Sequence, residues 1–176
     1  MCGNSMGGGV AWRYALEHPD RVDRLILVDA VGYESDDSGP GILGLTEVPV
    51  VNQLAQLATP RVLVESLLES AYGDPSRVTE SLIDRYHDLL RRPGNREAIG
   101  RLQAVRIRPD RPRSESSSHE TLVMWGELDT WIPPANAERF VSDLPNAELV
   151  TYPDLGHVPM EEGPDTSVAD VRAFFE

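Results

Sequence analysis

Short apolar runs alternate along the chain with segments in which apolar residues recur every three or four positions. The runs lie at 24–28, 121–125 and 148–152, and each is typical of a buried parallel strand. Helical spacing occurs at 6–18, at 133–144 through Ala137, Phe140, Val141 and Leu144, and near the C-terminus through Val168, Val171, Phe174 and Phe175. This alternation of strands and helices predicts a parallel α/β layer structure.

The pattern changes between the first and second apolar runs, where only helical spacing is found. Three helices are predicted there, through Val64, Leu67, Leu68, Ala71 and Tyr72; through Val78, Leu82, Tyr86, Leu89 and Leu90; and through Ala98, Leu102 and Val105. Polar stretches at 34–41 and 106–118 flank them, and the serine cluster at 114–118 is typical of a linker. We therefore divide the chain into a core region at 1–32, a helical insertion at 33–117 and a second core region at 118–176.

A G-x-S-x-G motif, formed by Gly3, Ser5 and Gly7, precedes the first predicted helix. Such a motif is typical of a sharp strand-to-helix turn that exposes a serine hydroxyl at the end of a sheet. A serine hydroxyl is a weak nucleophile, so it needs an adjacent base that is itself oriented by an acid. Ser5 is the candidate nucleophile, and the chain should supply a histidine and a carboxylate nearby.

The candidate base is His157, which lies in the loop after the last predicted strand. The candidate acid is Asp129, just after the second run, where chemistry collects in open parallel sheets. Asp29 follows the first run in the same way and is the rival acid. The other histidines are worse placed, at a helix end, on a polar helix face and in the linker: His18, His87 and His119.

The chain resembles the α/β-hydrolase superfamily, in its serine-nucleophile branch, over essentially its whole length. The resemblance is specific in three blocks, 3–8, 125–133 and 156–162, and in the order Ser, Asp, His. It implies Ser5 as nucleophile, His157 as general base and Asp129 as the acid that orients it. It also implies the backbone N–H of Met6 as an oxyanion donor, and a helical cap at 33–117 over the active site.

The residues around Ser5 also limit the reaction that the resemblance implies. A serine at this position argues against haloalkane dehalogenases and epoxide hydrolases, which place an aspartate there. With Asn4 before the serine, the motif resembles that of hydrolases that cleave carbon–carbon bonds in ring-fission products. Those enzymes carry a Trp after the histidine, where this chain has Val158. We therefore predict an esterase-like activity on a small ester through an acyl-enzyme, with carbon–carbon hydrolysis as the minor alternative.

Members of the superfamily have an eight-stranded sheet with this turn after the fifth strand, whereas only two residues precede Gly3 here. The expectation is therefore the C-terminal part of the fold, with the last three parallel strands, flanking helices and the cap, and with the N-terminal strands absent. This predicts the loss of a second oxyanion donor and an unpaired edge on the strand at 24–28. The alternative is an inactive remnant, or a split half that acts only by association at that edge.

Charge and composition bear on partners rather than on the fold. All 16 basic residues are arginine, and 29 acidic residues give a net charge of −13, which argues against a nucleic-acid partner. Salt adaptation and genome composition both remain open as the origin of this acidity. Cys2 is the single cysteine, and no apolar run reaches the ~18 residues of a membrane span, so we expect a cytoplasmic protein without membrane contact. The sequence contains no metal-ligand cluster or nucleotide-binding loop, so no cofactor is predicted.

Overall fold

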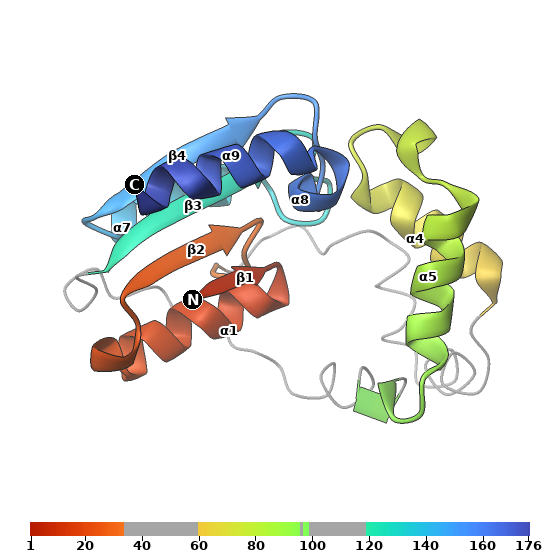
Figure 1. Ribbon diagram of the computed structural model, residues 1–176, viewed down its shortest axis with the longest axis horizontal. Helices are drawn as coiled ribbons and strands as arrows, with labels where there is room; N and C mark the ends of the chain where they lie inside the picture. The colour runs from red at the N-terminus through yellow and green to blue at the C-terminus, as the bar shows by residue number, and fades with distance from the viewer. Residues whose placement is uncertain (34–59, 96, 99–118) are drawn as a thin grey trace.

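The computed structural model describes residues 1–33, 60–95, 97–98 and 119–176. Its centre is one parallel sheet whose strands follow each other in chain order (Figure 1). The strands are β1 (Cys2–Asn4), β2 (Arg24–Val28), β3 (Glu120–Gly126) and β4 (Ala147–Tyr152). All three apolar runs are therefore strands within a residue or two of their predicted bounds.

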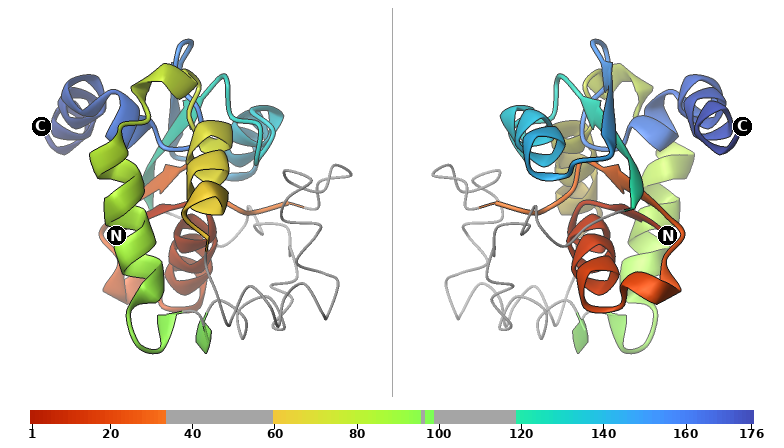
Figure 2. Two further views of the ribbon diagram at one scale, coloured as in Figure 1. Left: turned by 90° about the vertical axis from the view of Figure 1, so that its right-hand side faces the viewer. Right: turned by 90° about the vertical axis from the view of Figure 1, so that its left-hand side faces the viewer.

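Helices cover both faces of this sheet, which explains why β2 and β3 are apolar at almost every position. Figure 2 shows α7 (Ala135–Asp143) and α9 (Pro164–Phe175) on opposite sides of the sheet. Alternate residues of β2 and β3 pack with α1 (Met6–Glu17) and α7 into one core: Leu25, Leu27, Val123 and Trp125, with Trp12 and Phe140. The intervening residues pack toward α9: Ile26, Val28, Leu122 and Met124, with Val171 and Phe174.

The apolar stripe predicted for the last helix is only half used by the core. Val171 and Phe174 pack against the sheet, whereas Val168 and Phe175 are 46% and 56% exposed. The helical period was therefore right, but the width of the buried face was overestimated. In the described part of the chain, no helix is both long and apolar enough to cross a membrane.

The strand count and the position of the sheet edge differ from expectation. Three strands were expected, with an unpaired edge on 24–28, but Cys2–Asn4 form a strand that pairs with β2 from Cys2↔Ile26 to Asn4↔Val28. Strand β2 therefore has neighbours on both sides, β1 and β3. The prediction of an unpaired edge was wrong because the three residues of β1 are enough to hydrogen-bond with the backbone of β2. Association of another chain at the sheet edge, now the edge of β1, remains a prediction.

Two helices of the predicted insertion lie beyond the carboxyl ends of the strands (Figure 1). They are α4 (Arg61–Ala71) and α5 (Glu80–Arg91), joined through a short 3-10 helix, η2 (Pro75–Arg77). Val64, Leu68 and Ile83 form the centre of a small apolar cluster between them. Of the third predicted helix only Ala98 is described, and the polar stretches at 34–41 and 106–118 lie outside the described residues.

Two further short helices complete the described elements. The 3-10 helix η1 (Pro19–Arg21) follows α1, and α8 (Pro159–Glu162) lies between β4 and α9. The loop between β4 and α8 carries His157. This loop and the carboxyl ends of the strands therefore meet on the side where α4 and α5 lie (Figure 1).

Candidate active site

Ser5 occupies a tight turn between β1 and α1. Its backbone has φ 53° and ψ −123°, a region that residues with side chains rarely adopt. The turn is held by Ser5 N–H, which donates to the Val28 carbonyl at 2.9 Å, and by the Ser5 carbonyl, which accepts from Val31 N–H at 3.0 Å. Gly3 makes this path possible, because a Cβ there would lie 2.3 Å from the Gly7 carbonyl oxygen. The motif therefore forms the strand-to-helix turn that the sequence predicts.

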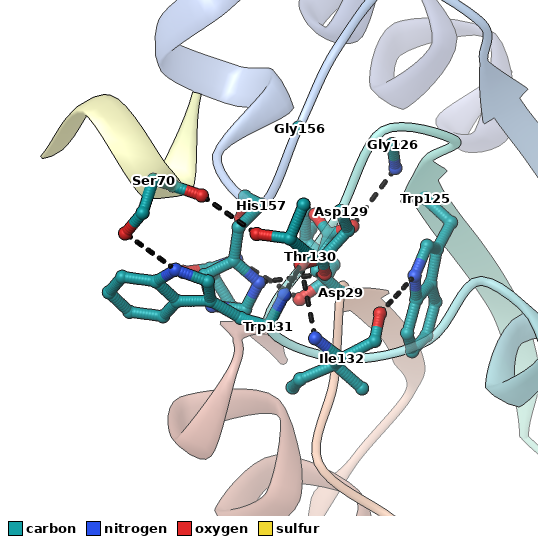
Figure 3. A network of polar contacts seen from close by, with 12 residues as sticks. Asp29, Ser70, Trp125, Gly126, Asp129, Thr130, Trp131, Ile132, Gly156 and His157 are labelled. Atoms are coloured by element: carbon teal, nitrogen blue, oxygen red, sulfur yellow. Dashed lines mark hydrogen bonds and ion pairs between the residues drawn. The ribbon is translucent and has the colours of Figure 1, made fainter. Parts of the chain in front are cut away.

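His157 and Asp129 form a buried pair at the ends of β4 and β3 (Figure 3). Nδ1 of His157 lies 2.8 Å from Oδ2 of Asp129, and the two residues are 2% and 6% exposed. The other oxygen of Asp129 accepts from the backbone N–H groups of Trp131 at 2.7 Å and Ile132 at 3.1 Å. Both oxygens of Asp129 therefore have hydrogen-bond partners, and a carboxylate held in this way can orient an imidazole that carries its proton on Nδ1.

The second ring nitrogen of His157 is left available for chemistry. Nε2 is buried and has no hydrogen-bond partner among the described residues, Ser5 included. With the proton on Nδ1, the lone pair on Nε2 can accept another proton. Ser5, Asp129 and His157 follow β1, β3 and β4 respectively, so the parallel sheet places all three at the carboxyl ends of its strands. Met6 is the first residue of α1, where an N–H has no acceptor within its own helix.

The backbone of His157 is held by groups that the sequence analysis did not single out for this purpose. Its N–H donates to the Ala71 carbonyl at 2.7 Å, at the end of α4. Its carbonyl accepts from Nδ2 of Asn4 at 3.1 Å, and the same amide donates to Val28 at 3.2 Å. Asn4 thus connects the serine turn to the histidine loop. An amide next to the candidate nucleophile, Ser5, was the one available signal in the sequence.

An indole ring lies alongside the imidazole. The ring centroids of Trp131 and His157 are 4.9 Å apart, with their planes tilted by 31°, and Figure 3 shows the two side by side. Trp131 Nε1 donates to the Ser70 hydroxyl at 3.1 Å, and Thr130 donates to the Ser70 carbonyl at 2.9 Å. The acid loop is therefore attached to the end of α4 as well.

Asp29, the rival acid, has different hydrogen-bond partners. It is fully buried, and its Oδ1 accepts from Gly126 N–H at 2.9 Å, while its Oδ2 has no partner among the residues described. The pKa of Asp29 is raised to about 9, mainly by burial; the hydrogen bond from Gly126 N–H opposes this rise, and the nearby charges of Asp129 and Glu162 contribute to it. Asp129, not Asp29, is therefore the hydrogen-bonded acid of His157.

Asp29, Asp129 and His157 are also the described group with the spacing of metal ligands. One potential ligand atom from each lies within 4.8 Å of the others. Oδ2 of Asp129 is already hydrogen-bonded to Nδ1 of His157. Oδ1 of Asp129 accepts from two backbone N–H groups. We interpret the group as an acid–base cluster.

A surface hollow of about 370 Å³, lined in part by Arg24 and Glu120, lies at the opposite ends of the strands.

The other histidines lie away from this cluster. His119 was expected in a linker, but it is 5% exposed immediately before β3, with Nε2 3.1 Å from the Pro19 carbonyl oxygen. His18 follows α1, and its ring lies 4.6 Å from that of Tyr14. His87 is on α5. Among the described residues, His157 is the histidine that is hydrogen-bonded to a buried carboxylate at the strand ends.

The family model described as "alpha/beta hydrolase fold" matches residues 1–164. The chain belongs to the α/β-hydrolase fold family. Among similar sequences, the 2-hydroxy-6-oxononadienedioate/2-hydroxy-6-oxononatrienedioate hydrolase of Comamonas testosteroni is 30% identical over 168 residues, covering 89% of this chain and 55% of that enzyme. Lipase 3 of a Moraxella species is 26% identical, covering 98% of this chain and 54% of the lipase.

A solved structure shows the same arrangement of elements. The meta-cleavage product hydrolase of Pseudomonas fluorescens superposes with a TM-score of 0.78 at 26% identity, covering 99% of this chain and 63% of that one. This α/β-hydrolase chain thus spans between about half and two thirds of the length of these relatives. The relatives are hydrolases, and the family assignment made from the three sequence blocks is confirmed.

Proposed function

We propose that the chain carries the catalytic groups of a serine hydrolase that cleaves a carbon–carbon bond next to a ketone. The observation that carries the hydrolase part is the buried pair of His157 and Asp129, with Nε2 of the histidine left free. Like Ser5, the pair lies at the carboxyl ends of the strands. Helices α4 and α5 form part of the cap above these strand ends.

In the proposed reaction Ser5 Oγ attacks the carbonyl carbon of the substrate, while its proton passes to Nε2 of His157. Asp129 stabilises the imidazolium that forms. The carbonyl oxygen becomes an oxyanion, which the Met6 N–H stabilises. The departing group then takes the proton from His157, and a water molecule releases the acyl group from Ser5 by the same sequence of proton transfers.

The relatives decide which bond we propose. A 2-hydroxy-6-oxononadienedioate contains no ester or amide, so a hydrolase of such a compound adds water across a carbon–carbon bond. Tautomerisation of the 2-hydroxydiene first moves the hydroxyl proton to the carbon next to the 6-ketone, which gives a 2-keto form with one double bond left between that carbon and the new keto group. Cleavage beside the 6-ketone is then chemically favoured, because the electron pair left on the departing carbon is delocalised through that double bond into the 2-keto group. Asn4 in the serine turn also supports this alternative. The sequence analysis preferred an ester because Val158 replaces the expected Trp. The relatives do not specifically support that preference, because they include carbon–carbon hydrolases as well as lipases.

Ester hydrolysis is the second candidate, because a lipase is among the similar proteins and uses the same class of acyl transfer. The two candidates separate by kinetics on the full-length protein. A 2-hydroxy-6-oxodienoate should have a higher kcat/KM than a p-nitrophenyl ester, and a fluorophosphonate should label Ser5. Greater turnover of the ester would favour the second candidate.

The control for both activities is Ser5→Ala, which keeps the fold and removes the nucleophile. It should abolish labelling and lower turnover of both substrates by about 10³-fold or more. A folded wild-type protein that neither reacts with the probe nor turns over either compound would overturn the proposed function.

A further inference from the structure

Glu162, at the end of α8, contacts the backbone on both sides of the joint between α4 and the histidine loop. Its Oε1 accepts from Gly156 N–H at 2.7 Å, and its Oε2 accepts from Gly73 N–H at 2.8 Å. Gly156 directly precedes His157, and Gly73 lies two residues after Ala71, whose carbonyl accepts the His157 N–H. One carboxylate therefore connects two segments that are 83 residues apart in the chain.

The two segments pack backbone against backbone at this point. A Cβ on Gly156 would lie 2.5 Å from the Gly73 nitrogen, and a Cβ on Gly73 would lie 2.8 Å from the Gly156 nitrogen. Two amides that approach so closely need an acceptor that both can share. Bonds from backbone N–H groups to a carboxylate are stronger than those between neutral groups, so Glu162 is well suited to hold this joint.

The neighbouring Glu161 has a different set of partners. Its carboxylate accepts from the hydroxyls of Tyr72 and Tyr86, at 3.2 and 2.9 Å, and pairs with Arg85 at 2.8 Å. These contacts attach α8 to α4 and α5 through side chains. These three partners are side chains, whereas Glu162 accepts from the backbone next to His157, so the two adjacent glutamates differ in what they hold.

We propose that Glu162 is a positioning residue for His157, which fixes the histidine loop to the turn after α4 so that the two move as one unit. The inference rests on the proposed role of His157 as general base. It follows that the end of α4 keeps a constant position relative to His157. An outward motion there would break the bonds of Glu162 and the bond from His157 N–H to Ala71.

The test compares Glu162→Ala with Glu161→Ala in the full-length protein, with active sites counted by fluorophosphonate titration. Displacement of a catalytic group by about 1 Å can cost about 10²-fold, so Glu162→Ala should lower kcat by about that factor with little change in KM. Glu161→Ala should change KM more than kcat, because it removes side-chain contacts to α5 and to Tyr72 but no backbone bond of the histidine loop. Glu162→Gln should lie between wild type and Glu162→Ala, because its amide oxygen can still accept from one N–H.

A second readout does not depend on turnover. The NMR signal of the Nδ1 proton shared between His157 and Asp129 should broaden or shift in Glu162→Ala and remain in Glu161→Ala. Glu162→Gln should shift this signal less than Glu162→Ala does and, because it keeps the shape of the side chain, it covers the case in which Glu162→Ala does not fold. Unchanged kcat and an unchanged proton signal in folded Glu162→Ala or, if that variant does not fold, in Glu162→Gln, with only the melting temperature lowered, would overturn the inference. Failure of the proposed function would appear separately, as a wild-type protein without labelling that retains the proton signal.

Discussion

Asp129 and Asp29 are both buried at the carboxyl ends of neighbouring strands, but only Asp129 is hydrogen-bonded to His157, with 2.8 Å between Oδ2 and Nδ1. Asp29 instead accepts from Gly126 N–H. The strand order accounts for the difference: β3, which precedes Asp129, lies next to β4, and the histidine loop follows β4. The two aspartates therefore provide a matched pair of variants.

Asp129→Asn should lower kcat by about 10⁴-fold, because an amide can no longer hold the imidazole with its proton on Nδ1. The matched control is Asp29→Asn, the same substitution at an equally buried aspartate, for which we expect a loss of less than about tenfold. Steady-state kinetics on the full-length variants measures both. An equal loss in the two variants would contradict the assignment of Asp129 as the acid.

Asp29 should make the stability of the protein depend on pH. Because burial raises its pKa to about 9, the folded protein keeps a proton on Asp29 that the unfolded chain releases above its ordinary value of 3.8. The unfolded state thus binds fewer protons between about pH 4 and pH 9, so the free energy of unfolding falls as the pH rises through that range. The stabilisation is complete below pH 4 and declines by at most about 1.4 kcal/mol per pH unit.

Asp29→Asn has no such proton and should lack this part of the pH dependence. Urea denaturation of both proteins at pH 5 and at pH 8 is the measurement. Wild type should lose free energy of unfolding relative to the variant between the two pH values. A difference between the proteins that stays constant across this range would mean that Asp29 is already ionised when folded.

Asn4→Asp should weaken the link between the serine turn and the histidine loop. The Asn4 amide donates to Val28 and to His157, whereas an aspartate can only accept and would face two carbonyl oxygens. We expect the free energy of unfolding to fall by about 2–4 kcal/mol, since two part-buried acceptors lose their donor.

The comparison for this variant is Asn95→Asp. The exposed amide of Asn95 also donates to a backbone carbonyl, that of Leu89 at 2.7 Å, but far from His157 in the fold. Its loss should cost less than about 1 kcal/mol and leave kcat unchanged. Chemical denaturation and kinetics on both variants test the pair, and equal costs would show that the two bonds of Asn4 contribute nothing specific.

The two glycines of the G-x-S-x-G motif should differ in their tolerance of a side chain. A Cβ on Gly3 would lie 2.3 Å from the Gly7 carbonyl oxygen, whereas a Cβ on Gly7 would meet no atom within 4 Å. Gly3→Ala should therefore prevent or severely impair folding. Gly7→Ala, inside α1, should fold and gain up to about 1 kcal/mol from its better helix propensity. Thermal unfolding of the two variants decides, and a destabilised Gly7→Ala would contradict this account of the turn.

Local pattern in the sequence was sufficient for most of the secondary structure. The first helix was predicted at 6–18 and is Met6–Glu17, and the apolar run at 24–28 is β2. These predictions succeed because a strand buried on both faces must be apolar at nearly every position, whereas a helix buried on one side must repeat every three or four residues. The motif around Ser5 is equally local, since its turn depends on the close approach of Gly3 to Gly7.

Contacts between distant segments were decided only in three dimensions. The sequence favoured Asp129 over Asp29 as the acid, but the contact itself depends on which strand lies beside β4. Likewise, the sequence marked Glu162 only as the end of the block at 156–162, because its role arises where the histidine loop meets the end of α4. The sequence by itself therefore determined most of the described elements, the family and the candidate residues, since these follow from short-range periodicity and motif spacing. The partner of His157, the pairing of β1 and the buried width of α9 were decided by the tertiary structure, because each depends on which segments come together when the sheet assembles.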